Sequence, residues 1–443
     1  MKNVRARLWL ALRKPFMKAK EINIGLLGLG TVGSGVWEIF HKNAAIIEER
    51  TGLKFKIKKI LVQDLKKKRQ VSVPADLLTT HPNDILNDPE ISIVVELLGG
   101  ILPAQNYILQ AIENGQHIVT ANKALLSEKA EELFSKAFAK SVTIGFEASV
   151  AGGIPIIQSL REGFVGNQIE EMYGIINGTC NYILSEMTSR KADFQSILKE
   201  AQQAGYAEAN PDFDVKGIDA SQKLAILTWL AFGTLPHKGI YVEGIDKITP
   251  LDIEYAQKLG YVIKLLAITR KKDAGIEARV HPTMIPATHP LARVDGVFNA
   301  VFLKGDAVGK TLFLGRGAGM MPTASAVVAD IIRAGKVSKE ILAPVFKSEE
   351  LLSIDHLNSE YYLRFSVVDK PGVFGQIAGA LGEFNVGIAA VYQQEKITGS
   401  RVPIVVLTHQ TREKNLHKAL EKIENLEAVL DTPTLIRVLE KNS

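Results

Sequence analysis

The sequence predicts an α/β protein in which a doubly wound parallel sheet comes first, an α+β region second and a ferredoxin-like βαββαβ module last. Two patterns support this order. From Ile22 to about residue 150, short apolar runs alternate with helical stretches, and the last 75 or so residues read strand, helix, strand, strand, helix, strand. The chain has 443 residues, which is more than a single hydrophobic core accommodates, so about three domains are expected.

The first domain is expected at residues 21–150. Its strands are expected at Ile22–Leu27, Phe55–Leu61, Ile91–Leu97, His117–Thr120 and Val142–Phe146. The helices between them are expected at Val32–Arg50, Pro103–Asn114 and Ser127–Ala139. Because short apolar runs alternate with helical stretches along this region, the strands are expected to lie parallel.

A substrate domain is expected at residues 151–335, a linker at 336–359 and the βαββαβ module at 360–443. The second domain is expected to hold strands near Gln168–Ile176 and Ile276–Met284 and helices near Asp219–Phe232, Pro250–Leu266 and Ala324–Ala334. The last of these helices is expected to return to the first domain. The module is expected as Tyr361–Val368, Gly375–Phe384, Gly387–Gln394, Val402–Thr408, Glu413–Leu426 and Thr434–Leu439.

The net charge of +5 comes from the N-terminus. Seven basic residues and no acid lie in residues 1–20, which leaves 46 basic against 48 acidic residues in the rest of the chain. This near-neutral body argues against nucleic-acid binding. The basic extension has two readings, a targeting segment or translation that begins at Met17, and we prefer the second.

Other classes of protein are disfavoured by composition. No apolar run approaches eighteen residues, so no membrane-spanning helix is expected. The single cysteine, Cys180, leaves no disulfide framework and fits a reducing compartment, so a cytoplasmic protein is expected.

The segment Gly28-Leu-Gly-Thr-Val-Gly33 follows one expected strand and opens the next helix. In this context the GxGxxG spacing is typical of Rossmann-type dinucleotide-binding domains, where glycines let the backbone approach a pyrophosphate at a helix N-terminus. We therefore expect the dinucleotide to contact Gly28, Gly30, Thr31, Val32 and Gly33.

The end of the second strand leaves the coenzyme open. Asp64 can accept a hydrogen bond from a ribose hydroxyl, which favours NAD, whereas the basic run from Lys66 to Arg69 can hold the extra phosphate of NADP. At the end of the fourth strand, Thr120 and Lys123 lie at the edge where open α/β sheets bind ligands.

Catalytic residues are also expected in the segment from Gly205 to Lys223, which carries four carboxylates and leads directly into an apolar helix. Residues four apart share a helix face, so Asp219 and Lys223 are expected to lie together, in line with Ile226 and Leu227. Burial lowers the pKa of a lysine and a neighbouring carboxylate raises it, so such a lysine can transfer a proton near neutral pH. An ordinary surface ion pair is the alternative.

These motifs together closely resemble homoserine dehydrogenase of the long form, which carries a C-terminal ACT domain. The matching segments are Gly25–Gly33, Thr120–Lys123, Phe146–Val150, Gly178–Leu184, Gly205–Lys223 and Gly315–Ser325, with Asp369–Val373 and Asn385 in the ACT-like part. The resemblance implies reversible hydride transfer between L-homoserine and L-aspartate 4-semialdehyde, with NAD or NADP, in threonine, methionine and isoleucine biosynthesis.

The resemblance also implies roles for single residues. Lys223 would carry the proton on the substrate oxygen, Asp219 would orient it, and Lys123 would polarise the same oxygen. The substrate-binding residues would be Glu208, Asp214, Gly178 and Thr179, and Gly315 would join the coenzyme-binding residues.

A cation and an effector are further implications of the resemblance. A Na⁺ or K⁺ ion would be held by Glu147 and the carbonyls of Val150, Gly152 and Ile154, a group that is a weak signal by sequence alone. Threonine would inhibit the enzyme by binding near Asp369, Gly372, Val373 and Asn385, and a homodimer or homotetramer is implied.

Two alternatives remain. The chain can be another amino-acid-pathway dehydrogenase with an ACT tail, such as a prephenate-type enzyme, which has no need of the segment from Glu208 to Lys223. It can also be a nucleotide-bound amino-acid sensor without activity, which has no reason to retain Lys123, Asp219 and Lys223 as a set.

Overall fold

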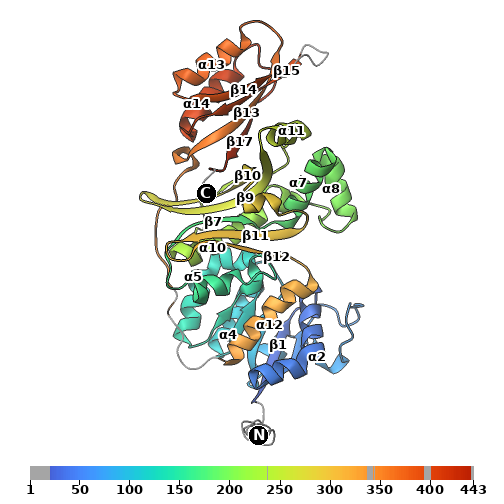
Figure 1. The fold of residues 1–443 in the computed structure, drawn as a ribbon. Coiled ribbons are helices and arrows are strands. Elements are labelled where there is room, and N and C mark those ends of the chain that lie inside the picture. Colours follow the sequence, from blue (N-terminus) through green and yellow to red (C-terminus); the bar gives the residue numbers. More distant parts are fainter. Residues whose placement is uncertain (1–19, 237, 337–342, 344, 394–400, 441–443) are drawn as a thin grey trace, which may run out of the picture. The chain divides into compact units, whose positions relative to one another are not determined.

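The computed structural model describes residues 20–236, 238–336, 343, 345–393 and 401–440, so nearly all of the basic extension lies outside the described part. The chain divides into two compact units, one from residues 1–153 and 318–344 and the other from residues 154–317 and 345–443. Each unit has a sheet of its own (Figure 1). Within the described ranges, no helix is long and apolar enough to cross a membrane.

The first unit is built on a six-stranded parallel sheet in the order β3-β2-β1-β4-β5-β6. Its strands are β1 Lys20–Leu27, β2 Leu53–Leu61, β3 Leu78–Thr79, β4 Ile91–Glu96, β5 His117–Thr120 and β6 Ile144–Gly145. Its helices are α2 Thr31–Thr51, α3 Asn83–Leu86, α4 Ala104–Glu113, α5 Lys123–Ala139 and α12 Met320–Lys336. The chain winds outward from β1 on one side and from β4 on the other, which confirms the predicted doubly wound fold.

Helix α12 packs tightly on α2 in this unit, although about 270 residues separate them in sequence. A Cβ atom on Gly35 would lie 2.6 Å from the Met320 carbonyl oxygen and 2.7 Å from the Ala324 Cβ, so only a glycine allows this approach. Ala324, Val327 and Ile331 are buried in the core that α12 shares with β1 and β4. The chain therefore returns to the first unit as α12, and this helix completes the hydrophobic core of that unit.

The second unit contains an eleven-stranded sheet whose main path is β12-β11-β7-β9-β10-β17-β13-β15-β14. Its first part holds β7 Ile169–Ile175, β8 Tyr241–Val242, β9 Tyr261–Lys272, β10 Gly275–Pro286, β11 Phe298–Gly305 and β12 Gly309–Arg316. The helices of this part are α7 Gly178–Arg190, α8 Phe194–Gln203, α9 Asp212–Val215, α10 Ile218–Phe232 and α11 Pro250–Lys258.

The helix predicted over Pro250–Leu266 is wrong beyond Lys258. Gly260, with φ of 81°, turns the chain, and β9 begins at Tyr261. Residues 263–270 of β9 are all buried, so the strand lacks the alternation of polar and apolar residues that would have identified it. A continuous apolar run fits a buried strand and a buried helix equally well.

The C-terminal part has the predicted βαββαβ order. Its elements are β13 Asn358–Val368, α13 Val373–Glu383, β14 Ile388–Gln393, β15 Arg401–Thr408, α14 Glu413–Glu424 and β17 Thr434–Val438, with the short β16 Thr411–Arg412 before α14. Strand β17 pairs with β10 in parallel, through Thr283 with Arg437 and Met284 with Val438. The module and the substrate region therefore share one continuous sheet.

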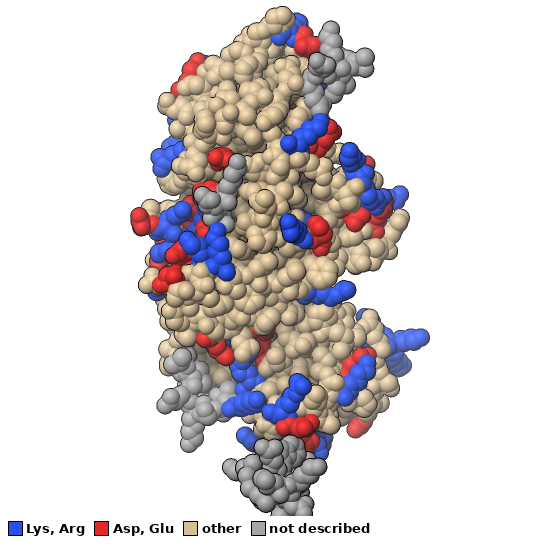
Figure 2. Space-filling model, in the orientation of Figure 1, with Lys and Arg blue, Asp and Glu red and all other residues tan. Residues whose placement is uncertain are grey.

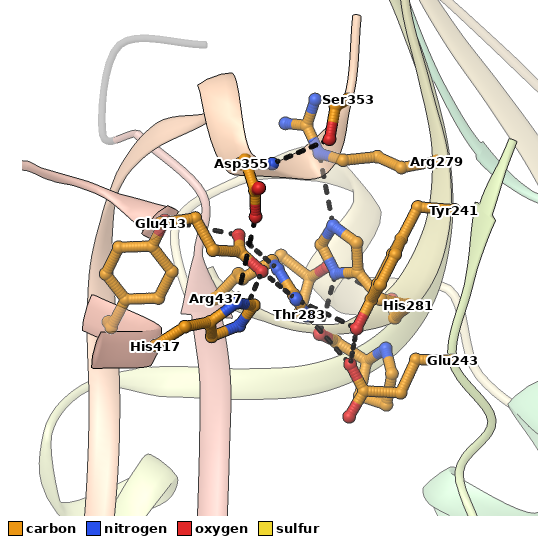
Figure 3. Close-up of polar contacts among 12 residues, drawn as sticks. Tyr241, Glu243, Arg279, His281, Thr283, Ser353, Asp355, Glu413, His417 and Arg437 are labelled. Carbon is orange, nitrogen blue, oxygen red and sulfur yellow. Dashed lines mark hydrogen bonds and ion pairs between the residues drawn. The ribbon is translucent and has the colours of Figure 1, made fainter. Parts of the chain in front are cut away.

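A buried ionic network reinforces this junction (Figure 3). Arg437, 2% exposed, bonds to Glu413 of α14 through Nε and Nη2. Its Nη1 lies 2.8 Å from Glu243 Oε2, and its Nη2 also lies 3.1 Å from the Tyr241 hydroxyl. Its guanidinium also lies over the Tyr241 ring. Desolvated charges are tolerated only when they are paired in this way. Charges on the face shown in Figure 2 are of both signs, in keeping with a near-neutral body.

Asp252 forms a second buried link across the junction. Its fully buried carboxylate caps α11 by accepting from the Thr249 backbone N–H, and it accepts from Arg364 Nε of β13 at 2.6 Å and from the Tyr362 hydroxyl at 3.1 Å. One carboxylate thus satisfies a helix N-terminus and an arginine of the module at the same time.

We expect Asp252→Ala to lower the free energy of unfolding by roughly 3–5 kcal/mol, because it leaves the Arg364 guanidinium buried without an acid. Asp193→Ala is the matched control, since Asp193 caps α8 by accepting from Ser196 N but is exposed; about 1 kcal/mol is expected there. Denaturant unfolding measures both. Equal losses would show that the Arg364 pair adds nothing to the cap.

Candidate functional site

Lys223 and Asp219 form a buried ion pair on α10, as their helical spacing predicted. The Lys223 Nζ lies 2.7 Å from Asp219 Oδ2 and 2.8 Å from the carbonyl oxygen of Ile176, which follows the end of β7. Only 13% of the lysine side chain and 7% of the aspartate side chain are exposed. The ammonium group is therefore fixed between a helix and a strand end, and the surface-pair alternative is wrong.

Asp214 on α9 joins this pair through Asn177. The Asn177 Nδ2 lies 2.7 Å from Asp214 Oδ1 and 2.9 Å from Asp219 Oδ2. Burial raises the pKa of Asp214, while the Asn177 hydrogen bond and the Lys223 charge act in the opposite direction. Asn177, Asp214, Asp219 and Lys223, which we call the carboxylate cluster, combine two acids, one amine and one amide.

Sequence reasoning missed Asn177. The residue ends the β7 segment and caps α7, and its Oδ1 accepts from Cys180 N at 2.8 Å. An asparagine between a strand and a helix is a recognisable N-cap signal, but nothing in the sequence links it to carboxylates 37 and 42 residues away.

The other predicted substrate-binding residues lie at the start of α7, for Gly178 and Thr179, and on the loop before α9, for Glu208. Gly178 is the first residue of α7, and a Cβ there would lie 3.0 Å from the Val297 carbonyl oxygen. Thr179 Oγ1 donates to the Tyr206 carbonyl oxygen at 2.7 Å, which ties α7 to the loop before α9. Glu208 is exposed on that loop, and within the described residues its side chain is not hydrogen-bonded to the carboxylate cluster.

The glycine motif of the first unit borders a cavity of about 800 Å³. Gly28 has φ of 108°, and a Cβ on Gly33 would lie 2.4 Å from the Gly28 carbonyl oxygen, so the turn requires both glycines. Gly30 is the N-cap of α2, and Thr31 and Val32 form its first turn. Backbone N–H groups at a helix N-terminus beside a large cavity are suited to bind a pyrophosphate.

Residues from the end of β2 line the same cavity. They include Asp64 and the basic side chains of Lys67, Lys68 and Arg69. The Asp64 Oδ1 accepts from Lys66 N at 2.8 Å, and Arg69 donates to the Lys67 carbonyl oxygen at 2.9 Å. The loop thus brings one acid and several bases to the place where an adenosine ribose is expected.

A buried carboxylate that the sequence did not reveal organises the ends of β4 and β5. Glu96, fully buried, accepts from Leu98 N at 2.8 Å, Gly99 N at 3.1 Å and Thr120 Oγ1 at 2.6 Å. Asn122 caps α5 by accepting from Leu125 N, and Lys123 is the first residue of that helix. Thr120 is therefore a structural anchor for the loop that presents Lys123.

Comparison with known proteins shows the family to which the chain belongs. Family models described as homoserine dehydrogenase, NAD binding domain, and homoserine dehydrogenase match residues 28–147 and 155–332, and an ACT domain model matches residues 361–428. Homoserine dehydrogenase of Neisseria gonorrhoeae is 47% identical over 430 residues, which is 95% of this chain and 99% of that protein. This chain belongs to the homoserine dehydrogenase family.

Other family members agree over the whole length. The Pseudomonas aeruginosa homoserine dehydrogenase is 43% identical over 96% of this chain and all of its own. The crystal structure of the Thiobacillus denitrificans homoserine dehydrogenase is 46% identical, covers 95% of this chain and 99% of its own, and superposes with a TM-score of 0.88. The resemblance drawn from the sequence motifs, and the ACT identity of the C-terminal module, are thereby confirmed.

The cation-site residues expected for this family lie at a constrained turn after β6. Glu147 is 3% exposed, and its backbone N donates to Asp330 Oδ2 of α12 at 2.7 Å. Val150 is buried, and Gly152 has φ of 54°. Ile154 belongs to the second unit. A carboxylate and turn carbonyls are hard oxygen donors, which fits a monovalent cation, whereas no group of three or more His, Cys, Asp or Glu suited to a metal occurs in the described ranges.

The structure separates the expected effector residues within one ACT domain. Asp369 and Gly372 precede α13, with Gly372 as its N-cap, and Val373 is its first residue, whereas Asn385, with φ of 58°, follows its other end. Eleven helical residues span roughly 16 Å. One amino acid cannot bridge Gly372 and Asn385 within the same chain.

Gly315, which was predicted to bind the coenzyme, lies in β12 of the second unit, whereas the glycine motif belongs to the first unit.

We expect Gly30→Ala and Gly33→Ala to fail in different ways. A Cβ at Gly30 meets no protein atom within 4 Å, so Gly30→Ala loses at most about 1 kcal/mol of stability, because alanine is a poorer N-cap. It loses dinucleotide affinity at least ~10-fold, because the methyl group occupies the phosphate's place. Gly33→Ala clashes with Gly28 and loses about 1–3 kcal/mol of stability. Fluorescence titration and thermal unfolding measure the two effects. Unchanged affinity in Gly30→Ala would place the phosphate elsewhere.

Proposed function

We propose that this chain is an NAD(P)-dependent homoserine dehydrogenase that interconverts L-homoserine and L-aspartate 4-semialdehyde. The observation that carries the proposal is the buried Lys223–Asp219 pair beside Asp214, within a chain that matches this family along its whole length. An amine held close to two acids is suited to an amino-acid substrate whose hydroxyl group is oxidised.

In this proposal, each residue of the site has its own role in the reaction. The turn from Gly28 to Gly33 would hold the dinucleotide, which would supply the hydride acceptor or donor for the substrate carbon. Lys223 carries the proton of the substrate oxygen: as a neutral amine it accepts the hydroxyl proton in oxidation, and as an ammonium it returns that proton in reduction. Asp219 and the Ile176 carbonyl hold its nitrogen in place. Lys123 polarises the reacting oxygen, and Gly178 and Thr179 border the substrate. Glu208 and Asp214 bind the substrate's ammonium group, which offsets the second negative charge of the carboxylate cluster.

Both NAD and NADP remain within the proposal, since Asp64 and the basic side chains of Lys67 to Arg69 line one cavity. A carboxylate there favours a free ribose hydroxyl and the bases favour a phosphate. A Na⁺ or K⁺ ion would be held by the Glu147 carboxylate and the carbonyls of Val150, Gly152 and Ile154, which are hard oxygen donors at the turn that follows β6.

We propose further that threonine inhibits the enzyme through the ACT domain, as expected for an enzyme of threonine, methionine and isoleucine biosynthesis. A chain of contacts that leads from the ACT domain to the residue after Asp214 supports this proposal. Arg437 of the ACT domain bonds to Glu243, and the adjacent Gly244 lies so close to α9 that a Cβ there would be 2.4 Å from the Val215 carbonyl oxygen. Val215 directly follows Asp214. A cytoplasmic homodimer or homotetramer completes the proposal.

We expect Lys223→Ala to lower kcat for homoserine oxidation by about 1000-fold or more, because the proton carrier is removed, with dinucleotide affinity nearly unchanged. Lys216→Ala is the matched control, since Lys216 forms an i,i+4 pair with Asp212 on the preceding segment but is exposed. Assays with NAD and with NADP measure both variants. Near-native turnover in Lys223→Ala would reject its role.

We expect millimolar threonine to lower turnover and to raise the melting temperature of the full-length enzyme, because an effector that binds one state stabilises it. Glu243→Gln should weaken the inhibition at least ~3-fold by removing one charge from the Arg437 network. Glu170→Gln, which breaks an exposed pair with Lys304, is the control. No threonine effect on either quantity would remove the regulatory proposal and leave the dehydrogenase activity standing.

A further inference from the structure

Asn177 holds two carboxylates with one amide group. Its side chain is buried, with 4% of the residue exposed, and its Nδ2 lies within 2.9 Å of both Asp214 Oδ1 and Asp219 Oδ2. The Oδ1 accepts from Cys180 N, which can only donate, so the opposite end of the amide must be the nitrogen. Each of the two amide hydrogens therefore serves one carboxylate.

This arrangement opposes the repulsion within the carboxylate cluster. Asp214 and Asp219 carry like charges in a partly buried place, and Lys223 bonds directly to Asp219. Without a shared donor, Asp214 would separate from Asp219 or take up a proton. A neutral amide brings the two acids together without adding a charge that would compete with the ammonium groups of Lys223 and a substrate.

We propose that Asn177 is the positioning residue of the reaction, which fixes the separation of Asp214 and Asp219 and thereby the place of the Lys223 amine. This inference rests on the proposed function of the carboxylate cluster. Asn177 itself is not expected to touch the reacting atoms, because its carbonyl group is used at the α7 N-terminus and its amide group by the two acids.

The competing interpretation is that Asn177 only caps α7. Capping requires the Oδ1 atom alone, and serine and aspartate cap helices as well as asparagine does. Substitution by either residue therefore separates the two interpretations. Asn177→Ser keeps a neutral cap that cannot reach both acids, and Asn177→Asp keeps the cap and the size but turns the donor into a third negative charge.

We expect Asn177→Ser to lower kcat/KM for homoserine about 10-fold or more and Asn177→Asp about 100-fold or more, with coenzyme affinity within about 2-fold of the native enzyme. The acid limb of the pH profile should move to higher pH in both variants. Burial and the charge of Asp219 raise the pKa of the Asp214 carboxyl, whereas the hydrogen bonds from Asn177 and Thr179 and the charge of Lys223 lower it. Loss of the Asn177 bond therefore raises this pKa. Cys180, whose thiol donates to the Asp214 carbonyl, also faces this carboxyl.

Asn181→Ser is the matched control on the same helix. Asn181 is 1% exposed and donates to the carbonyl oxygens of Val294, Gly296 and Phe298, so its loss also removes buried hydrogen bonds. It should cost stability without moving the acid limb. Native kcat/KM and an unmoved acid limb in Asn177→Ser, or equal shifts in Asn177→Ser and Asn181→Ser, would overturn the inference. Absence of homoserine oxidation in the native enzyme would instead reject the proposed function.

Discussion

The burial of charge around Lys223 is the constraint on which the rest of this structure depends. An ammonium and two carboxylates lose hydration when they leave water, and only short, well-directed hydrogen bonds compensate for that loss. Those bonds come from Asp219, from the Ile176 carbonyl and from Asn177. A strand end, two helix N-termini and the helix that carries Lys223 must therefore meet at one point.

The large sheet of the second unit joins that point to the ACT domain. Ile176 follows β7, which pairs with β9; β9 pairs with β10, and β10 pairs with β17 of the ACT domain. The segment Tyr241–Ile245 makes a second connection, because Ile245 N donates to the Val215 carbonyl oxygen at 2.9 Å while Glu243 bonds to Arg437. Two hydrogen-bonded routes therefore connect β17 to the carboxylate cluster, one through the sheet to Ile176 and Lys223 and one through Tyr241–Ile245 to α9.

Local spacing explains what the sequence predicted. The doubly wound sheet, the glycine turn at Gly28, the Lys223–Asp219 pair and the βαββαβ module all depend on residues close together in the chain. Asn177, Glu96 and the Arg364–Asp252 pair were not predicted, because their partners lie tens of residues away and only the fold brings them together. The strand β9 was partly misread, since burial on both faces erases its periodicity.

Lys264 is a second buried lysine, and its surroundings differ from those of Lys223. It is 1% exposed, burial lowers its pKa, and it donates to the Val294 carbonyl oxygen and to Asp295. Lys264 lies within β9, however, opposite Thr283 of β10, and the acid to which it bonds, Asp295, is largely exposed to solvent. Lys223 differs by its position beside a strand end and by two inward carboxylates. With Lys223 protonated and both acids ionised, the cluster carries one negative charge in excess, which fits the proposed substrate because that substrate brings an ammonium group.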